Sequence, residues 1–421
     1  MTFSPRRHAT AIAGTVLLAV VALGCSPTAT AGPSSASATP QAIPTATPTA
    51  RLAATPSSAA TPQPTVTAAV PTPTPVFGFA ATGNPGAVDK TTLTLLQDGR
   101  VLMAGGVDGP LHALASAQLY DPKSGAFTAT GSLLTARADA TATLLSDGKV
   151  LVAGGKVDAS IYTGGPKTAG LPVASAELYD PTSGTFSATG SMLNARTGAT
   201  ATLISGGRVL VVGGASGAEV YDPGSGKFTA AGKMIATRYY GATASLLPDG
   251  RVLVVGGSGK TGALASAEIY DPGTNKFTAT GSMHSARVYH SATTLSDGRI
   301  LIAGGCSSGQ VGSAALATAE IYDPKTQKFS LTGSMTSRRA YQGAALLGDG
   351  RVIVGGGSPA FGHLQGIPNG ELFDAKTGTF HAAGALTERH WTMQAVSLPD
   401  GRALFVGGMW GAEVFGPLRA G

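Results

Sequence analysis

The chain has little of what several common protein classes require. It contains two cysteines among 421 residues, and one of them is expected to be consumed by processing, so no intrachain disulfide is predicted. Charged residues make up only 12% of the sequence, and the net charge of +6 is not gathered into a run or a stripe. The sequence therefore does not predict a nucleic-acid partner. No segment shows a sustained helical period, which disfavours a helical fold.

Familiar catalytic motifs are also missing. No Gly-x-Ser-x-Gly elbow or phosphate-binding loop stands out, and the repeated Gly-Gly pairs end apolar runs instead of cradling a nucleotide. The histidines do not fall in a paired metal-binding spacing such as His-Glu-x-x-His. Six of them follow residue 75, namely His112, His284, His290, His363, His381 and His390. No catalytic residue is predicted from these patterns.

The first 25 residues carry an export signature. Arg6 and Arg7 precede an apolar stretch, residues 9–23, that is too short to span a membrane comfortably. The stretch runs into Val21-Ala22-Leu23-Gly24-Cys25, which resembles a bacterial lipoprotein signal with Cys25 as the acylated residue. Residues 1–24 are thus predicted to be a signal peptide, and the protein to be extracytoplasmic and lipid-anchored to the cell membrane. Ordinary secretion and an uncleaved anchor are the alternatives.

Residues 25–75 form a segment of low complexity. They are dominated by Pro, Thr, Ala and Ser, and Arg51 is the only charged residue among them. Such a composition buries too little apolar surface to offset the entropy of ordering, so a disordered, extended linker is predicted. The linker is expected to lift the following domain off a membrane or through a cell wall. A solubilising tail is the alternative.

Beyond residue 76 one module recurs with a period of roughly 50 residues, which is typical of propellers and solenoids. Each copy has an apolar run, an Asp-Gly or Gly-Gly turn, a stronger apolar run ending in Gly-Gly, a loop, an element such as Tyr270-Asp271-Pro272, and a strand beginning at Phe. Dipeptides such as Asp98-Gly99 predict two-residue hairpin turns. The Gly-Gly pairs begin at Gly105, Gly154, Gly213, Gly256, Gly304, Gly356 and Gly407. Seven modules of four strands are therefore predicted.

One fourth strand is missing from its expected place. The chain stops after the third strand of the seventh module, whereas Phe79-Ala80-Ala81-Thr82-Gly83 copies the fourth-strand sequence ahead of the first module. Donating this N-terminal strand to the last sheet would close a ring and remove exposed sheet edges. The sequence thus predicts an all-β fold over residues 76–421, a seven-bladed β-propeller closed by an N-terminal strand.

The Gly-Gly pairs, the Tyr-Asp-Pro elements and the aromatic strands together resemble the kelch repeat across residues 76–421. The Arg-x-Tyr-His-Ser sequence beginning at Arg287 is similar to a segment of the galactose oxidase family, whose central domain is a kelch propeller. That resemblance implies a copper ion held by two tyrosines and two histidines, with one tyrosine thioether-linked to a cysteine. Tyr289 and His290 match the Tyr-His pair, and Tyr341 matches the cross-linked tyrosine. The two motifs stand in the opposite chain order here, and Cys306 follows a Gly-Gly pair instead of lying in the family's cysteine motif.

An arginine and an acidic residue recur at fixed places in the modules. We predict that they form structural pairs in or between blades, and that removing one partner costs roughly 3–5 kcal/mol. The arginines are Arg137, Arg196, Arg238, Arg287, Arg339 and Arg389. The third strands carry Gln118, Glu177, Glu219, Glu268, Glu320, Glu371 and Glu413.

One face of the predicted propeller is favoured for binding. The loops between second and third strands vary widely in length and lie on the same side as the connections between blades, opposite the tight turns. Aromatic residues two positions after the repeated arginine open onto this face, together with Cys306 and His363. They could stack sugars or anchor a protein, or they could merely plug the channel mouth. The predicted binding residues are Tyr240, Arg287, Tyr289, His290, Tyr341, His390, Trp391 and Trp410.

These observations favour a non-enzymatic binding scaffold at the cell surface, with a protein or glycan ligand on the loop face and a membrane contact through the lipid at Cys25. No cofactor or metal is predicted. The alternative is an enzyme, either a copper oxidase with Tyr289, His290 and Tyr341 as candidate ligands or a carbohydrate-modifying propeller. Cys306 is interpreted either as a buried, inert residue or as a reactive thiol.

Overall fold

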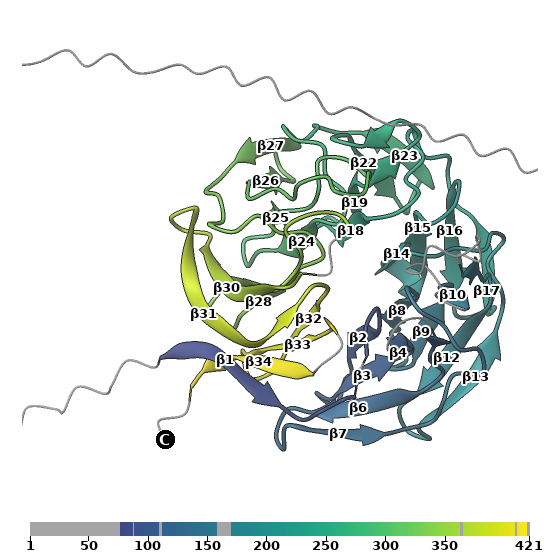
Figure 1. The fold of residues 1–421 in the computed structure, drawn as a ribbon. Helices are drawn as coiled ribbons and strands as arrows, with labels where there is room; N and C mark the ends of the chain where they lie inside the picture. The colour runs from purple at the N-terminus through teal and green to yellow at the C-terminus, as the bar shows by residue number, and fades with distance from the viewer. Residues whose placement is uncertain are drawn as a thin grey trace, which may run out of the picture. The chain divides into compact units, whose positions relative to one another are not determined.

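The computed structural model describes residues 76–86, 88–108, 112–157, 170–362, 365–408 and 411–418, so the predicted signal peptide, Cys25 and the linker lie outside the described residues. Within these segments seven four-stranded antiparallel sheets are arranged as blades around a central axis (Figure 1). The prediction of an all-β, seven-bladed propeller is confirmed. No helix of the described segments is long and apolar enough to cross a membrane.

Six blades are built from consecutive strands, and the seventh borrows β1. Blade 1 contains β2 (Thr92–Leu95), β3 (Val101–Ala104), β6 (Ala117–Asp121) and β7 (Ala126–Ala129). Blade 2 contains β8 (Thr141–Leu144), β9 (Val150–Ala153), β12 (Ala176–Asp180) and β13 (Thr185–Thr189). Blade 3 contains β14 (Thr200–Leu203), β15 (Val209–Val212), β16 (Ala218–Asp222) and β17 (Lys227–Ala230), with the short 3-10 helix η1 (Ser205–Gly207) between the first two strands. Blade 4 contains β18 (Ala242–Leu246), β19 (Val252–Gly256), β22 (Ala267–Asp271) and β23 (Lys276–Ala279). Blade 5 contains β24 (Ser291–Thr294), β25 (Ile300–Ala303), β26 (Ala319–Asp323) and β27 (Lys328–Leu331). Blade 6 contains β28 (Gly343–Leu346), β29 (Val352–Gly355), β30 (Ile367–Asp374) and β31 (Thr379–His390). Blade 7 contains β32 (Gln394–Ser397), β33 (Ala403–Val406), β34 (Ala412–Pro417) and β1 (Phe77–Thr82).

Three of the loops between second and third strands carry short hairpins of their own. These are β4 (Val107–Asp108) with β5 (His112–Ala113), β10 (Lys156–Val157) with β11 (Leu171–Pro172), and β20 (Ser258–Gly259) with β21 (Gly262–Ala263). Because each blade is an antiparallel meander, these loops share a face with the connections between blades, which we call the loop face. The opposite face carries the tight turns.

The second strand of each blade explains why the blades stack. All four residues of β15 are buried, and its side chains alternate between two neighbouring blades. Val209 and Val211 pack into the cluster shared with blade 2, whereas Leu210 and Val212 pack into the cluster shared with blade 4. A strand that is apolar on both faces is therefore sandwiched between sheets, as its sequence predicts.

The Asp-Gly turns differ from the two-residue turns that the sequence predicts. Leu96 N donates to Arg100 O and Gly99 N donates to Leu96 O, so three residues form the loop. Only Gly99 has a positive φ, of 87°. This is a turn followed by a left-handed glycine, the geometry of three-residue hairpin loops. Asp98 accepts a hydrogen bond from Arg100 N and pairs with the Arg100 side chain, which stabilises the longer loop.

The ring is closed by β1, as predicted. It pairs antiparallel with β34, with Phe79 opposite Phe415 and Thr82 opposite Ala412 (Figure 1). Phe79 is buried and contacts a cluster that includes Phe405 and Phe415. The first strand of the domain thus completes the outer edge of the last blade.

The predicted structural pairs between arginine and glutamate are present in five blades. Each has both charged groups almost completely buried, which identifies them as part of the scaffold. They are Arg137–Glu177 (2.6 Å), Arg196–Glu219 (2.7 Å), Arg238–Glu268 (2.8 Å), Arg287–Glu320 (3.0 Å) and Arg339–Glu371 (2.8 Å). In blade 7 the prediction that Arg389 pairs with the glutamate is wrong, because the next residue, His390, contacts Glu413.

Candidate functional site

The mouth of the channel on the loop face is built by backbone hydrogen bonds between consecutive blades. In each of the blades concerned, one residue lies just before the first, innermost strand. Its backbone N–H donates to the backbone carbonyl of the matching residue in the preceding blade. The bonds run from Asp139 N to Lys90 O (3.2 Å), Gly198 N to Asp139 O (3.1 Å), Tyr289 N to Gly241 O (3.0 Å) and Tyr341 N to Tyr289 O (3.1 Å). In blade 7 the donor is Met393, one residue beyond the matching position, and its N–H donates to Tyr341 O (2.9 Å). These bonds fix the backbone of the residues that form them around the mouth.

Two tyrosines hold this register in a backbone conformation that tyrosine rarely adopts. Tyr289 has a φ of 57° and Tyr341 a φ of 59°. Lys90 (53°) and Asp139 (52°) are left-handed at the same register in blades 1 and 2, whereas blades 3 and 4 use Gly198 and Gly241. A left-handed non-glycine residue costs on the order of 1–2 kcal/mol, and such residues cluster at functional sites. The two strained tyrosines therefore mark the mouth as a candidate site.

Blade 4 departs from the predicted spacing. Tyr239 N donates to Ser258 O and Ser258 N donates to Tyr240 O, so two residues face one at this point of the ring. The insertion moves Tyr240 out of the left-handed register, which Gly241 occupies with a φ of 65°. Tyr240 nevertheless extends its ring towards blade 5.

The aromatic rings at the mouth form a continuous group, here called the tyrosine cluster: Tyr240, Tyr289, Tyr341 and Phe361. The rings of Tyr289 and Tyr341 are stacked with centroids 4.1 Å apart, and Tyr240 stacks on Tyr289 at 5.6 Å. Phe361, from a loop of blade 6, lies 5.7 Å from Tyr289. Beneath the cluster lie four fully buried small residues, Val288, Cys306, Ala315 and Ala340. Three of the predicted binding residues, Tyr240, Tyr289 and Tyr341, are thus brought together. The fourth ring, that of Phe361, was not predicted from the sequence.

The opposite side of the mouth carries charge. Lys156 Nζ lies 2.6 Å from Asp139 Oδ2, and the lysine is buried. Asp89 is also buried, and it accepts hydrogen bonds from Lys90 N and from the hydroxyl of Thr392 across the seam between blades 1 and 7. Burial raises the pKa of Asp89 above its ordinary value. The mouth is therefore aromatic over blades 4–6 and charged over blades 1 and 2.

Asp89 and Lys90, in the charged half of the mouth, were not predicted from the sequence for a specific reason. Blade 1 has no arginine two residues before Lys90, so counting from the arginine could not find Asp89 or Lys90. Phe361 lies in a loop of variable length, where the repeat gives no register. Counting back from the innermost strand would have identified Lys90, because its place before β2 matches that of Asp139 before β8.

Several predicted binding residues are not exposed. Arg287 and His390 are 0% exposed and His290 is 6% exposed, so these side chains belong to the packed interior. Trp391 lies half-buried before β32, one position away from the register of Tyr289 and Tyr341. Trp410 and His363 lie outside the described residues.

The residues do not fit the copper centre that the galactose oxidase resemblance implies. His290 is packed between blades 4 and 5, and its Nε2 lies 2.9 Å from the hydroxyl of Thr243. Burial, with Arg287 and Arg238 nearby, lowers the pKa of His290 to about 3, so the imidazole is neutral but enclosed. No group of three His, Cys, Asp or Glu side chains within the described ranges is arranged to hold a metal ion. Tyr289 belongs to the tyrosine cluster, whereas its neighbour His290 lies in the interface between blades 4 and 5.

Cys306 matches the inert interpretation better than the reactive one. Its side chain is 0% exposed, and its backbone bridges both Val288 and Ala315. Burial raises the pKa of the thiol to about 11. Since the thiolate is the nucleophilic form, a thiol with this pKa reacts slowly at neutral pH.

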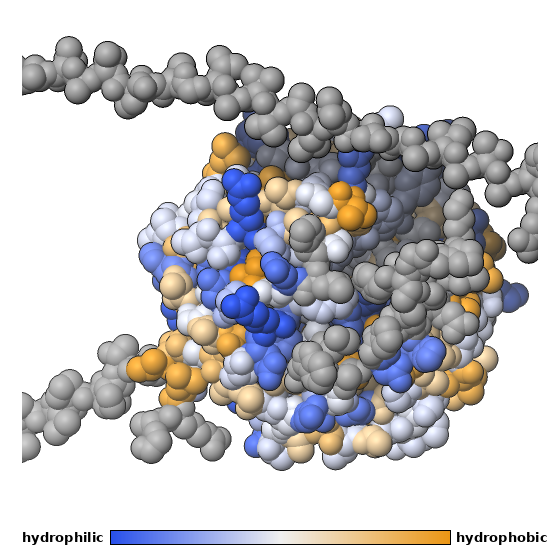
Figure 2. Space-filling view, viewed as in Figure 1, coloured by the Kyte–Doolittle hydropathy of each residue, from blue (hydrophilic) through white to orange (hydrophobic). Residues whose placement is uncertain are grey.

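The described surface that is visible beside the mouth does not form one apolar patch (Figure 2). Figure 2 shows hydrophilic and hydrophobic side chains interspersed over the visible face. A large uniform hydrophobic patch would have marked a partner surface by itself. The candidate site is distinguished instead by the geometry of the tyrosine cluster.

Comparisons with known proteins agree with this fold. A family model for the kelch motif matches residues 242–284 and 287–336, which cover blades 4 and 5. No curated protein matches the chain significantly in sequence.

Two solved structures resemble the propeller. A fungal alcohol oxidase of the AA5 family, in complex with copper, has a TM-score of 0.64 and 18% identity, over 81% of this chain and 76% of the oxidase. The protein YjhT has a TM-score of 0.55 and 15% identity, over 72% of this chain and 99% of YjhT. At these identities the likeness concerns the fold alone. The chain is therefore a seven-bladed β-propeller in which the fourth and fifth blades match the kelch motif.

Proposed function

We propose that this protein is an exported binding module that holds a protein or glycan ligand at the channel mouth on its loop face. The observation that carries the proposal is the tyrosine cluster, in which two rings are held by left-handed backbone at Tyr289 and Tyr341. Glycine fills this register in blades 3 and 4, whereas Lys90, Asp139, Tyr289 and Tyr341 fill it in blades 1, 2, 5 and 6, and only the two tyrosines among these stack their rings at the mouth. Contact between their rings and a ligand would account for strained tyrosines at these two positions.

The two halves of the mouth suit an amphipathic ligand. Half-buried aromatic rings supply large contact area at little entropic cost and anchor partners in binding interfaces. On the other side, Lys90 and Asp139, whose carboxylate pairs with the buried Lys156, offer polar contacts that would orient the ligand.

Export is part of the proposal because of the N-terminal signature. The apolar stretch that ends at Cys25 supports lipid attachment, and the Pro- and Thr-rich residues 25–75 support a spacer that presents the propeller away from the membrane. Metabolic labelling with a fatty acid tests the attachment. Cys25→Ser should abolish the label and release the protein from the membrane fraction.

Binding is tested with the full processed protein on a glycan array and in cross-linking experiments with surface proteins of its own host. The variant Tyr289→Ala should weaken binding of any recovered ligand by tenfold or more, about 1.4 kcal/mol. Lys325→Ala, on the tight-turn face, is the matched control and should bind as the wild type does. A ligand that binds Tyr289→Ala and the wild type equally would refute a site at the mouth.

The alternative is a copper oxidase, which the structural likeness to the fungal alcohol oxidase brings into consideration. The enclosed imidazole of His290 opposes it. Metal analysis of the purified protein, with a mass-spectrometric search for a tyrosine–cysteine thioether at Cys306, decides between the two functions. Stoichiometric copper together with that thioether would establish the oxidase.

A further inference from the structure

Blade 7 replaces the buried arginine of blades 2–6 with a histidine. In blade 6, Arg339 donates to Gly356 O at 2.9 Å and to Glu371 Oε1 at 2.8 Å. In blade 7 the two ring nitrogens of His390 face the equivalent acceptors: Nδ1 lies 2.6 Å from Gly407 O, and Nε2 lies 3.0 Å from Glu413 Oε1. Only 1% of each side chain of this pair is exposed, so both contacts are made away from bulk solvent.

The two contacts fix the number of protons on the pair. A backbone carbonyl can only accept, and an ionised carboxylate can only accept. A neutral imidazole has one N–H, so it can donate to Gly407 or to Glu413 but not to both. Both contacts become hydrogen bonds only when the pair holds one further proton, either on the imidazole or on Glu413. The arginines of the other blades meet the same demand with a permanent charge.

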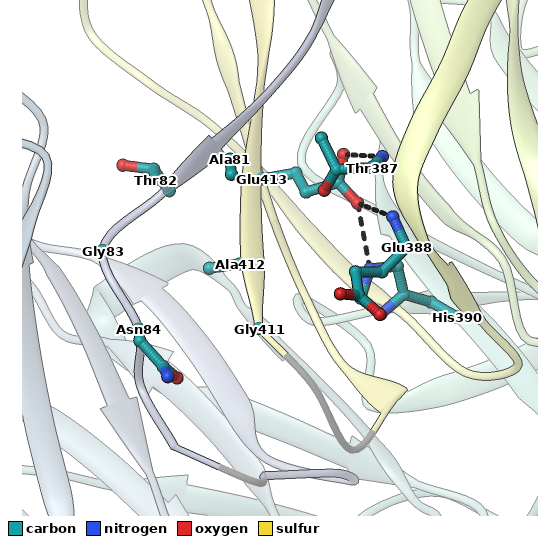
Figure 3. A pocket seen from close by; sticks show the side chains of 10 residues that line it. All are labelled: Ala81, Thr82, Gly83, Asn84, Thr387, Glu388, His390, Gly411, Ala412 and Glu413. Atoms are coloured by element: carbon teal, nitrogen blue, oxygen red, sulfur yellow. Dashed lines mark hydrogen bonds and ion pairs between the residues drawn. The ribbon is translucent and has the colours of Figure 1, made fainter.

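The pair lies where the ring is closed. Glu413 belongs to β34 and stands opposite Ala81 of β1, and it also accepts a hydrogen bond from Thr387 N at 2.9 Å. Figure 3 shows His390 and Glu413 beside a pocket of about 280 Å³ between the end of β1, the end of β31 and the start of β34. On the other side of the seam, blade 1 has Gln118 in place of the glutamate, and its amide donates to Pro85 O at 2.9 Å. The two blades that meet at the seam are thus the two whose described residues contain no arginine–glutamate pair.

Few other charged groups face His390. Glu388 and Arg389 are its neighbours on β31, and both are exposed. Strands β1 and β33 contain no titratable residue, and Glu371 of β30 is already paired with Arg339. Glu413 is therefore the charged partner that decides the proton count.

We propose that His390 and Glu413 form a proton-dependent latch that holds β1 in the last blade. With the extra proton, both contacts are satisfied and the seam is closed. When the pH rises and that proton is lost, the unprotonated ring nitrogen of His390 faces either Gly407 O or the Glu413 carboxylate at hydrogen-bond distance. Two acceptors then face each other without a proton between them, and this destabilises the β1–β34 pairing. The seam consequently loosens as the pH rises, whereas the blades that carry arginine do not respond.

Hydrogen exchange of the full-length protein, measured by mass spectrometry from about pH 5.5 to about pH 8.5, tests the latch. After correction for intrinsic exchange rates, the opening constant of peptides from β1 and β34 should increase with pH, by up to tenfold per pH unit for one proton. Peptides from β19 in blade 4 should show no such increase. His390→Arg should remove the pH dependence at the seam, and His381→Gln, an exposed histidine of the same strand, should keep it.

An identical pH dependence in His390→Arg, or none in the wild type, would overturn the latch. If His390→Arg does not fold, NMR of the wild type with ¹⁵N-labelled imidazole and ¹³C-labelled carboxylates gives the answer directly. The latch requires either two ring N–H groups or a protonated Glu413 at neutral pH. A singly protonated ring beside an ionised Glu413 would rule it out.

Discussion

The ring of Phe79 lies 4.9 Å from the ring of Phe415, centroid to centroid, in an edge-on arrangement. The two residues stand opposite each other in the β1–β34 pair although 335 positions separate them in the sequence. Phe79 also meets Phe405 at 5.4 Å, and its ring fills space left by Gly370. One aromatic side chain therefore joins the start of the domain to its last blade and to blade 6.

Replacing Phe79 with alanine should destabilise the whole propeller. The change removes a buried ring and leaves a cavity at the seam, which costs roughly 3–5 kcal/mol. Denaturant unfolding followed by fluorescence or circular dichroism measures the loss. Ala80→Ser, an exposed position of the same strand, is the control and should change stability by less than about 0.5 kcal/mol. Equal stability of the two variants would mean that β1 does not hold the ring closed.

The variant Glu268→Ala should lower the free energy of unfolding by roughly 3–5 kcal/mol, because it leaves Arg238 buried without its charge partner. The exposed pair Asp249–Arg251 supplies the contrast, and Asp249→Ala should cost no more than about 1 kcal/mol. The double variant Arg238→Met, Glu268→Leu should recover much of the loss. An unchanged melting curve for Glu268→Ala would refute the structural role of these pairs.

Backbone strain at the mouth is tested by two substitutions at Tyr341. Both Tyr341→Ala and Tyr341→Gly remove the ring, but only glycine adopts a φ of 59° without strain. The glycine variant should be more stable than the alanine variant by about 1 kcal/mol. At Ser330, on the exposed edge strand β27, the order should reverse. Thermal unfolding of the four variants checks both comparisons, and alanine being the better residue at Tyr341 would contradict the left-handed backbone.

His290 should make the protein sensitive to acid. Its pKa is lowered to about 3 in the folded protein from an ordinary 6.5, so between these values the unfolded chain binds a proton that the folded chain excludes. Stability therefore falls as the pH drops from 6.5 towards 3, by at most about 1.4 kcal/mol per pH unit from this group. His290→Gln copies Gln342, which holds the same place in blade 6, and should flatten this part of the pH profile. Urea unfolding at several pH values measures it, and a profile identical to that of the wild type would exclude His290 as the cause.

Much of the fold could be predicted because each blade is encoded locally. Apolar runs such as that of β15 and the displaced strand at Phe79 each signal their structure within a few residues. Asp98-Gly99 likewise signals the place of a turn, although its loop has three residues instead of the predicted two. The buried pairing of Arg238 with Glu268 was also predictable, since both recur at fixed places in the repeat.

The candidate site was less predictable, because its geometry depends on a one-residue register. Tyr289 and Tyr341 were found by counting from the arginine, but the insertion at Tyr239 and Tyr240 and the shift from Arg389 to His390 changed that count. Phe361 had no motif to reveal it, and Lys90 lacked the preceding arginine from which the count began.

The sequence by itself determined the number of blades, the order of their strands and the strand that closes the ring. It could do so because apolar periodicity and turn residues act over short stretches of chain. Only the tertiary structure decided which side chains meet at the mouth and which residue completes the seam. Hydrogen bonds between neighbouring blades set that register, and they join residues whose spacing along the chain varies from module to module.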